Sequence, residues 1–172
     1  MATDAESSAV VQLLGALKRE GIPFMLVGMS AANLQGILAS TIDVDIWIGL
    51  PSRQYMRIAN LCLSLGATLR SPNKVYLSDD TPVDFIYEVT GLPAFDKELL
   101  KAKWLSFHGQ RIAVLPLERI CKSKQAAGRD KDKLHILLIK QALKCRRAAI
   151  ARRSPGKQAI VKQPGSRRNQ RG

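Results

Sequence analysis

Two aspartates at alternate positions of an apolar segment are the residues best suited to chemistry. Asp43 and Asp45 alternate with aliphatic residues, which predicts a β-strand that projects both carboxylates from one face, about 7 Å apart. Converging carboxylates repel each other unless a cation lies between them, and oxygen-only ligands suit Mg²⁺. A third carboxylate, Asp84, lies in a second apolar segment, where a charged group is locally costly and so points to function. The alternative is that all three carboxylates only face solvent on one side of an antiparallel sheet.

A glycine and a serine precede the two aspartates, where an apolar segment (residues 24–27) meets a predicted helix. Gly28 allows close approach of the backbone to a ligand, and a helix N-terminus with the Ser30 hydroxyl is suited to bind an anion. Glycine and serine also occur at many strand–helix turns for structural reasons. The turn alone therefore leaves both readings open.

The elements that position these residues follow from hydrophobic periodicity and from glycine and proline punctuation. The pattern predicts helices at residues 5–20, 30–38, 52–65 (capped by Ser52), 95–103, 116–127 and from 130 onward. It predicts strands at residues 24–27, 41–48, 74–77 and 83–89, and a hairpin of 104–107 with 111–115, turned at His108 and Gly109. Residues 1–150 should form one mixed domain of helices and strands, in which Trp47 packs in the core rather than stacking on a base.

Composition indicates a globular protein that does not cross a membrane. The chain has 172 residues, of which 46% are hydrophobic and 24% charged, enough for one domain with its own core. No apolar stretch approaches the roughly 18 residues of a membrane-spanning helix. We also see no secretory signal at the N-terminus. The three cysteines are too far apart for a disulfide framework. A cytoplasmic location is therefore expected.

Positive charge is concentrated at the C-terminal end. The formal net charge is +13, and residues 133–172 contain 12 of the 27 Lys and Arg and no Asp or Glu. We predict that residues 151–172 are a disordered basic tail and that residues 140–172 bind nucleic acid weakly and without sequence preference. Because residues 140–172 contain no Phe, Tyr or Trp, only phosphate contacts remain. The alternative is a solubilising tail without a partner.

Taken together, the motifs resemble the nucleotidyltransferase superfamily, which has the DNA polymerase β-like fold. The resemblance is strongest to minimal nucleotidyltransferases, the small stand-alone bacterial and archaeal members related to toxin–antitoxin systems. Residues 27–30 match the apolar-Gly turn, residues 43–46 match Asp-apolar-Asp-apolar, and Asp84 matches the third carboxylate. Residues 123–132 are similar to the Ser-Lys-x-x-Ala-Gly-Arg-x-Lys-Asp run near the end of such domains. The resemblance covers roughly residues 22–140.

The resemblance implies an α+β fold, a mixed and mostly antiparallel β-sheet flanked by α-helices, followed by a C-terminal helix. It also implies Mg²⁺-dependent transfer of a nucleoside monophosphate from a nucleoside triphosphate, such as ATP, to an acceptor hydroxyl by a two-metal mechanism. Asp43, Asp45 and Asp84 would bind the metal ions, and Asp84 would also deprotonate the acceptor. The residues implied in nucleotide binding are Gly28, Ser30, Lys124, Arg129 and Lys131. The acceptor stays open: RNA, a protein or a small molecule.

Two departures from the family pattern support an alternative. Met29 stands where Gly or Ser is usual, and Ala39 stands where an arginine is often found. Both positions lie on the nucleotide side of the implied site. The alternative is a catalytically degenerate member that binds a nucleotide, nucleic acid or a partner. Likewise, Lys124, Arg129 and Lys131 could form a solvated helix end that pairs with Asp132.

Overall fold

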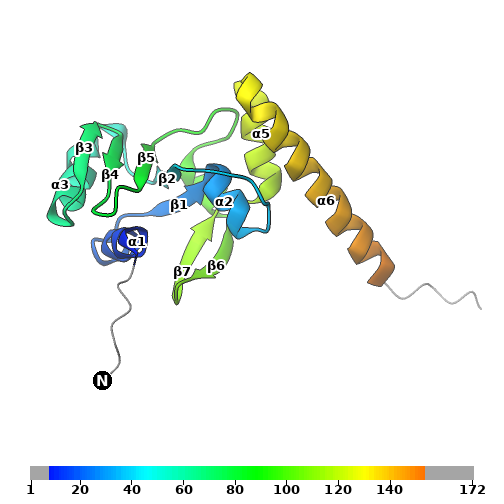
Figure 1. The fold of residues 1–172 in the computed structure, drawn as a ribbon, viewed down its shortest axis with the longest axis horizontal. Helices are drawn as coiled ribbons and strands as arrows, with labels where there is room; N and C mark the ends of the chain where they lie inside the picture. The colour runs from blue at the N-terminus through cyan, green and yellow to red at the C-terminus, as the bar shows by residue number, and fades with distance from the viewer. Residues whose placement is uncertain (1–7, 154–172) are drawn as a thin grey trace, which may run out of the picture.

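A single mixed β-sheet forms the centre of the computed structural model, which describes residues 8–153 (Figure 1). Its seven strands lie in the order β3-β4-β5-β2-β1-β7-β6. The pairs β2–β5 and β1–β7 are parallel, whereas the other four neighbouring pairs are antiparallel. The strands are β1 (Phe24–Val27), β2 (Val44–Ile48), β3 (Thr68–Ser71), β4 (Lys74–Tyr76), β5 (Pro82–Ile86), β6 (Lys103–Phe107) and β7 (Gln110–Val114). The predicted α+β class, with a mixed and mostly antiparallel sheet, is confirmed.

Helices pack around this sheet and supply much of the core. They are α1 (Ala9–Arg19), α2 (Gly28–Leu34), α3 (Tyr55–Ser64), α4 (Phe95–Leu99), α5 (Leu117–Ala127) and α6 (Lys133–Arg153), with 3₁₀ turns at Ser52–Gln54 and Asp130–Asp132. Helix α1 has this conformation because Leu13, Leu14 and Leu17 recur on one face, where all three are buried. Helix α6 packs on α5 and then extends away from the sheet (Figure 1), so Ile139 is its one fully buried residue. Among residues 8–153, no helix is both long and apolar enough to cross a bilayer.

The strand that carries the aspartates is shorter than predicted. We expected residues 41–48, but β2 begins at Val44, and the side chain of Ile42 is 81% exposed. The partner strand β1 has only four residues, whose last pairing joins Val27 to Asp45. The Thr41 hydroxyl donates to the carbonyl of Asp43, a local contact within the irregular segment that precedes the strand. Asp43 therefore lies just before the strand.

Several other elements differ from their predicted bounds. The helix predicted at 52–65 is a 3₁₀ turn followed by α3, and Ser52 makes no capping hydrogen bond. Strand β3 was missed because its four side chains are all exposed and show no apolar alternation. The helices predicted at 30–38 and 95–103 are shorter, since α2 ends at Leu34 and α4 at Leu99. The first residues of the helix predicted at 5–20 lie outside the described residues, as do residues 154–172 of the tail predicted at 151–172. Residues 151–153 belong to α6, so the start of that predicted tail is wrong.

Candidate functional site

Strand pairing brings two of the predicted aspartates together. In the parallel pair β2–β5, Asp45 is the register partner of Asp84, so both side chains leave the same face of the sheet from adjacent strands. Asp43 lies two residues before Asp45 on the same side. All three line one cavity of about 520 Å³. The predicted solvent-facing alternative is too simple, because the carboxylates share a concave site.

The central carboxylate, Asp45, is held in an unfavourable electrostatic setting. Burial is the largest cause, followed by the like charges of Asp84 and then Asp43, and together they raise the pKa of Asp45 from 3.8 to about 6. Lys124 and Arg129 oppose the shift only in part. A carboxylate held in this way becomes more stable when a cation approaches. The donor set is therefore chemically suited to Mg²⁺, which prefers oxygen ligands.

The glycine of the strand–helix turn is required by this carboxylate. Gly28 has φ of +65°, a left-handed conformation that favours glycine. A Cβ atom at Gly28 would collide with the carboxylate of Asp45. The glycine therefore allows the Asp45 side chain to lie directly against the backbone. The sequence pattern instead predicts a contact of Gly28 with phosphate.

Strand β4 adds a residue that the sequence analysis missed. Lys74 is the register partner of Asp84 in the antiparallel pair β4–β5. Its Nζ lies 3.4 Å from Oδ2 of Asp84 and 3.6 Å from Oδ2 of Asp43. Desolvation acts to lower the pKa of Lys74, but the two carboxylates outweigh it and raise the pKa above its ordinary value. The one signal in the sequence was a lysine at the start of the strand predicted at residues 74–77, which directly precedes the predicted strand of Asp84.

The three aspartates line one cavity, and the Lys74 ammonium pairs with two of them. Within residues 8–153, no three side chains of His, Cys, Asp or Glu are grouped closely enough to hold a metal ion as they stand. The metal-binding and catalytic roles of Asp43, Asp45 and Asp84 therefore stay predictions, supported by donor chemistry and by a shared cavity.

A cationic wall closes the other side of the cavity. Lys124 from α5, together with Arg129 and Lys131 from the following turn, lines it as predicted. Asp132, only 1% exposed, accepts from Lys124 Nζ at 2.7 Å and from Arg129 Nε at 2.6 Å. Burial alone would raise the pKa of Asp132, but these hydrogen bonds hold it below its usual range. Lys124 and Asp132 therefore form a buried ion pair rather than a solvated helix end, whereas Arg129 and Lys131 are exposed.

The predicted Ser30 is absent from the cavity lining, whereas Met29 and His135 are part of it. Ser30 does not line the cavity, and its hydroxyl donates to the carbonyl of Val27 at 3.2 Å. Met29 is buried and lines the cavity instead. His135, which the sequence analysis did not promote, also lines the cavity, and its Nδ1 lies 3.5 Å from Lys124 Nζ. Burial and then the charge of Lys124 lower the pKa of His135, although the carboxylate of Asp132 acts in the opposite direction.

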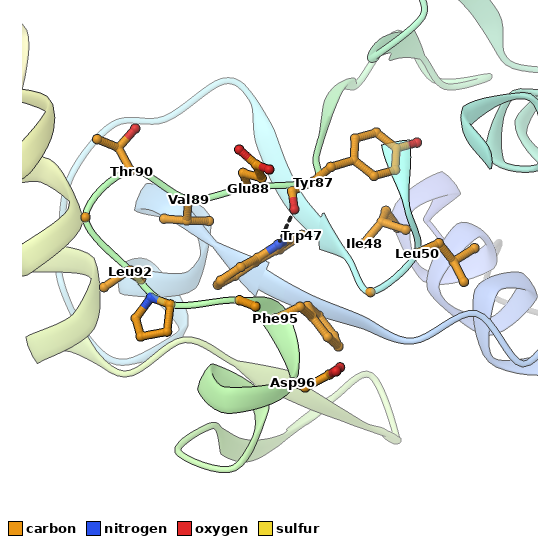
Figure 2. A pocket seen from close by; sticks show the side chains of 14 residues that line it. Trp47, Ile48, Leu50, Tyr87, Glu88, Val89, Thr90, Leu92, Phe95 and Asp96 are labelled. Carbon is orange, nitrogen blue, oxygen red and sulfur yellow. Dashed lines mark hydrogen bonds between the residues drawn. The ribbon is translucent and has the colours of Figure 1, made fainter. Parts of the chain in front are cut away.

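Trp47 belongs to a different cavity, of about 730 Å³, at the other end of β2 (Figure 2). Its indole N–H donates to the carbonyl of Tyr87 at 3.1 Å, and its ring meets Phe95 edge to face at 5.6 Å. The side chain is 1% exposed. The prediction that Trp47 packs in the core is confirmed, and none of the predicted site residues lines this second cavity.

Comparison with known proteins identifies the fold. No protein-family model matches the chain, and no curated protein sequence matches it. The structure is similar to ANT(2")-Ia in complex with adenylyl-2"-tobramycin, with a TM-score of 0.57 and 15% identity over 83% of this chain and 92% of that one. It is also similar to the lincomycin-bound lincosamide antibiotic adenylyltransferase LnuA, with a TM-score of 0.55 and 11% identity over 80% of this chain and 98% of that one. The link to toxin–antitoxin systems has no support in these matches and stays a prediction. At such low identity the likeness concerns the fold alone, and the chain therefore has a nucleotidyltransferase fold.

Proposed function

We propose that this protein is a Mg²⁺-dependent nucleotidyltransferase that moves a nucleoside monophosphate from a nucleoside triphosphate to an acceptor hydroxyl. The observation that carries the proposal is the pairing of Asp45 with Asp84 on adjacent parallel strands, in one cavity with Asp43. The cavity of about 520 Å³ is within the size range of small-molecule sites. The fold shared with ANT(2")-Ia and LnuA supports the same class of reaction.

Each side of the cavity has a distinct role in this reaction. Asp43, Asp45 and Asp84 would hold the divalent ions of a two-metal site, and these ions would neutralise charge on the phosphates. Asp84 would accept the proton of the acceptor hydroxyl. The oxygen of that hydroxyl then forms a bond to the α-phosphorus, the bond from this phosphorus to its bridging oxygen breaks, and pyrophosphate leaves.

The cationic wall would bind the triphosphate unequally. Lys124 is already engaged by the buried carboxylate of Asp132, so its charge is largely balanced. Lys131 and Arg129 are exposed at the cavity. Arg129 shares Asp132 with Lys124 through its Nε, but its two terminal nitrogens can still turn to phosphate oxygens in a bidentate manner. We assign the main phosphate contacts to these two residues. Lys124 would act chiefly by holding the wall in place.

The test is transfer of label from nucleoside triphosphates labelled at the α-phosphate, with Mg²⁺ present, to total RNA, total protein and a metabolite extract. The proposal expects label in one of these fractions, and loss of that label in Asp45→Asn and in Asp84→Asn. Asp80→Asn is the matched control, because Asp80 lies in an exposed turn away from the cavity. No transfer to any fraction, or transfer unaffected by the two site variants, would contradict the proposal.

A degenerate nucleotide-binding protein is the second candidate, favoured by two observations. Met29 contributes to the cavity wall where the family has a small residue, and Lys74 pairs with Asp43 and Asp84. A thermal-shift experiment separates the candidates. A nucleoside triphosphate with Mg²⁺ at 100 times its Kd stabilises a protein by about 2.7 kcal/mol. A shift that Asp45→Asn abolishes, without transfer of label, would establish the degenerate reading.

A further inference from the structure

Lys74 occupies a position that the proposed reaction does not yet explain. Its ammonium lies between Asp43 and Asp84, within 3.6 Å and 3.4 Å of one oxygen of each. Within the described part of the chain, neither aspartate has another ion-pair partner. The two carboxylates come from different segments, one just before β2 and one within β5, and β4 supplies the cation that joins them.

A metal ion held by Asp43 and Asp84 and this ammonium would share the same two carboxylates. The ion pairs are partly exposed, since 30% of the Lys74 side chain, 45% of Asp43 and 30% of Asp84 is accessible. Ion pairs of this kind are weak and can be displaced by a more strongly charged cation. The displacement nevertheless leaves Lys74 without an anion beside a newly bound positive charge. A free divalent ion therefore competes with Lys74 for the carboxylates. Repulsion between the two positive charges disfavours a site that holds the ion and the ammonium together.

A metal–triphosphate complex removes this conflict. Its phosphate oxygens enter together with the metal and offer the ammonium a replacement partner, and the flexible four-carbon stem of a lysine allows the charge to move. The binding of metal and nucleotide would then be coupled, and such coupling is reciprocal by thermodynamic necessity.

We propose that Lys74 is a specificity-determining residue that makes the site reject free divalent ions and accept metal bound to a nucleoside triphosphate. This inference rests on the proposed function, because it takes Asp43, Asp45 and Asp84 as metal ligands. Lys74 is a tethered cation that neutralises Asp43 and Asp84 in the empty site and then transfers its charge to the triphosphate.

The experiment is a titration of the protein with Mn²⁺, with and without a non-hydrolysable ATP analogue. Electron paramagnetic resonance measures the concentration of free Mn²⁺ at each step and so gives its Kd. The proteins are the full-length wild type, Lys74→Met, Lys74→Arg and Lys103→Met. Lys103 is the matched control, because it is an exposed lysine on β6, at the opposite edge of the sheet from β3 and β4. Lys74→Arg keeps the positive charge and should resemble the wild type.

Lys74→Met should bind free Mn²⁺ about tenfold more tightly than the wild type, as expected for removal of one nearby positive charge. The enhancement of Mn²⁺ affinity by the analogue should shrink by a similar factor, and Lys103→Met should change neither quantity. A Kd of free Mn²⁺ that is unchanged in Lys74→Met, or an enhancement that persists, would overturn the inference. Thermal melting of each variant verifies that it is folded.

Asp45→Asn separates this inference from the proposed function. If the wild type binds Mn²⁺ in a manner that requires Asp45, but Lys74→Met behaves as the wild type, only the role of Lys74 is wrong. If no variant binds Mn²⁺ with or without the analogue, or if binding ignores Asp45, then the proposed metal site is wrong and this inference fails with it.

Discussion

Replacing Asp45 by Asn should stabilise the folded protein at neutral pH, although it removes a proposed ligand. The carboxylate is partly buried and faces the like charges of Asp84 and Asp43; burial and these charges together raise its pKa from 3.8 to about 6. A raised pKa means that the folded state binds the proton more tightly than the unfolded state does. The charged form of Asp45 therefore opposes folding above about pH 6, and this penalty disappears as the pH falls below 3.8.

The size of the effect follows from the shift. Each pKa unit corresponds to about 1.36 kcal/mol, so a shift of about two units amounts to ~3 kcal/mol near pH 7.5 and ~1 kcal/mol near pH 4.5. The stability gained by Asp45→Asn should therefore fall by ~2 kcal/mol between these two conditions. Any constant cost of the amide cancels in this difference. Ionised carboxylates that converge on one site lower the free energy of unfolding, and such a loss of stability is expected at functional sites.

Urea denaturation of wild type and Asp45→Asn at both pH values, without divalent ions, measures this difference. Asp80→Asn is the control, since Asp80 lies in an exposed turn with a positive φ that Asn tolerates and does not line the cavity. Equal stability changes for Asp45→Asn at the two pH values would refute the electrostatic account of the site.

Three further predictions concern the turn, the cationic wall and the basic end of the chain. Gly28→Ala should lower the free energy of unfolding, measured by urea denaturation, by more than ~2 kcal/mol, because the left-handed conformation and the neighbouring carboxylate both oppose a Cβ. Gly109→Ala, with open space around the residue, should lower it by only ~1–2 kcal/mol. Equal losses in the two variants would argue against a collision at Gly28. Lys124→Met should destabilise the protein by ~3 kcal/mol by leaving the buried Asp132 short of a partner, and adding Asp132→Asn should recover part of the loss; no recovery would contradict the ion-pair account. Ending the chain at Ala151 should weaken RNA binding and lower the slope of its salt dependence by about 0.7 for each phosphate that the shortened chain no longer neutralises; unchanged affinity and slope would exclude the removed residues from binding.

The local sequence pattern was sufficient to predict those elements whose bounds depend on burial or on turn-forming residues. Strand β1 coincides with its predicted bounds because all four of its residues are buried. The hairpin of β6 and β7 turns where expected, since His108 and Gly109 both adopt positive φ. The end of α5 at Gly128, with φ of +62°, follows from the same freedom of glycine. In each case the controlling interactions lie within a few residues in the sequence.

Only the tertiary structure decided how the site is assembled. Alternation identified Asp43 and Asp45, but the register of β2 with β5 brings Asp84 beside Asp45, and the register of β4 with β5 brings in Lys74. Strand order and register depend on the packing of whole layers, which no local window contains. Ser30 illustrates the converse, since its residue type suited a phosphate but its hydroxyl bonds to its own turn. The sequence by itself determined which residue types were available for chemistry, whereas packing between distant segments decided which of their charges meet.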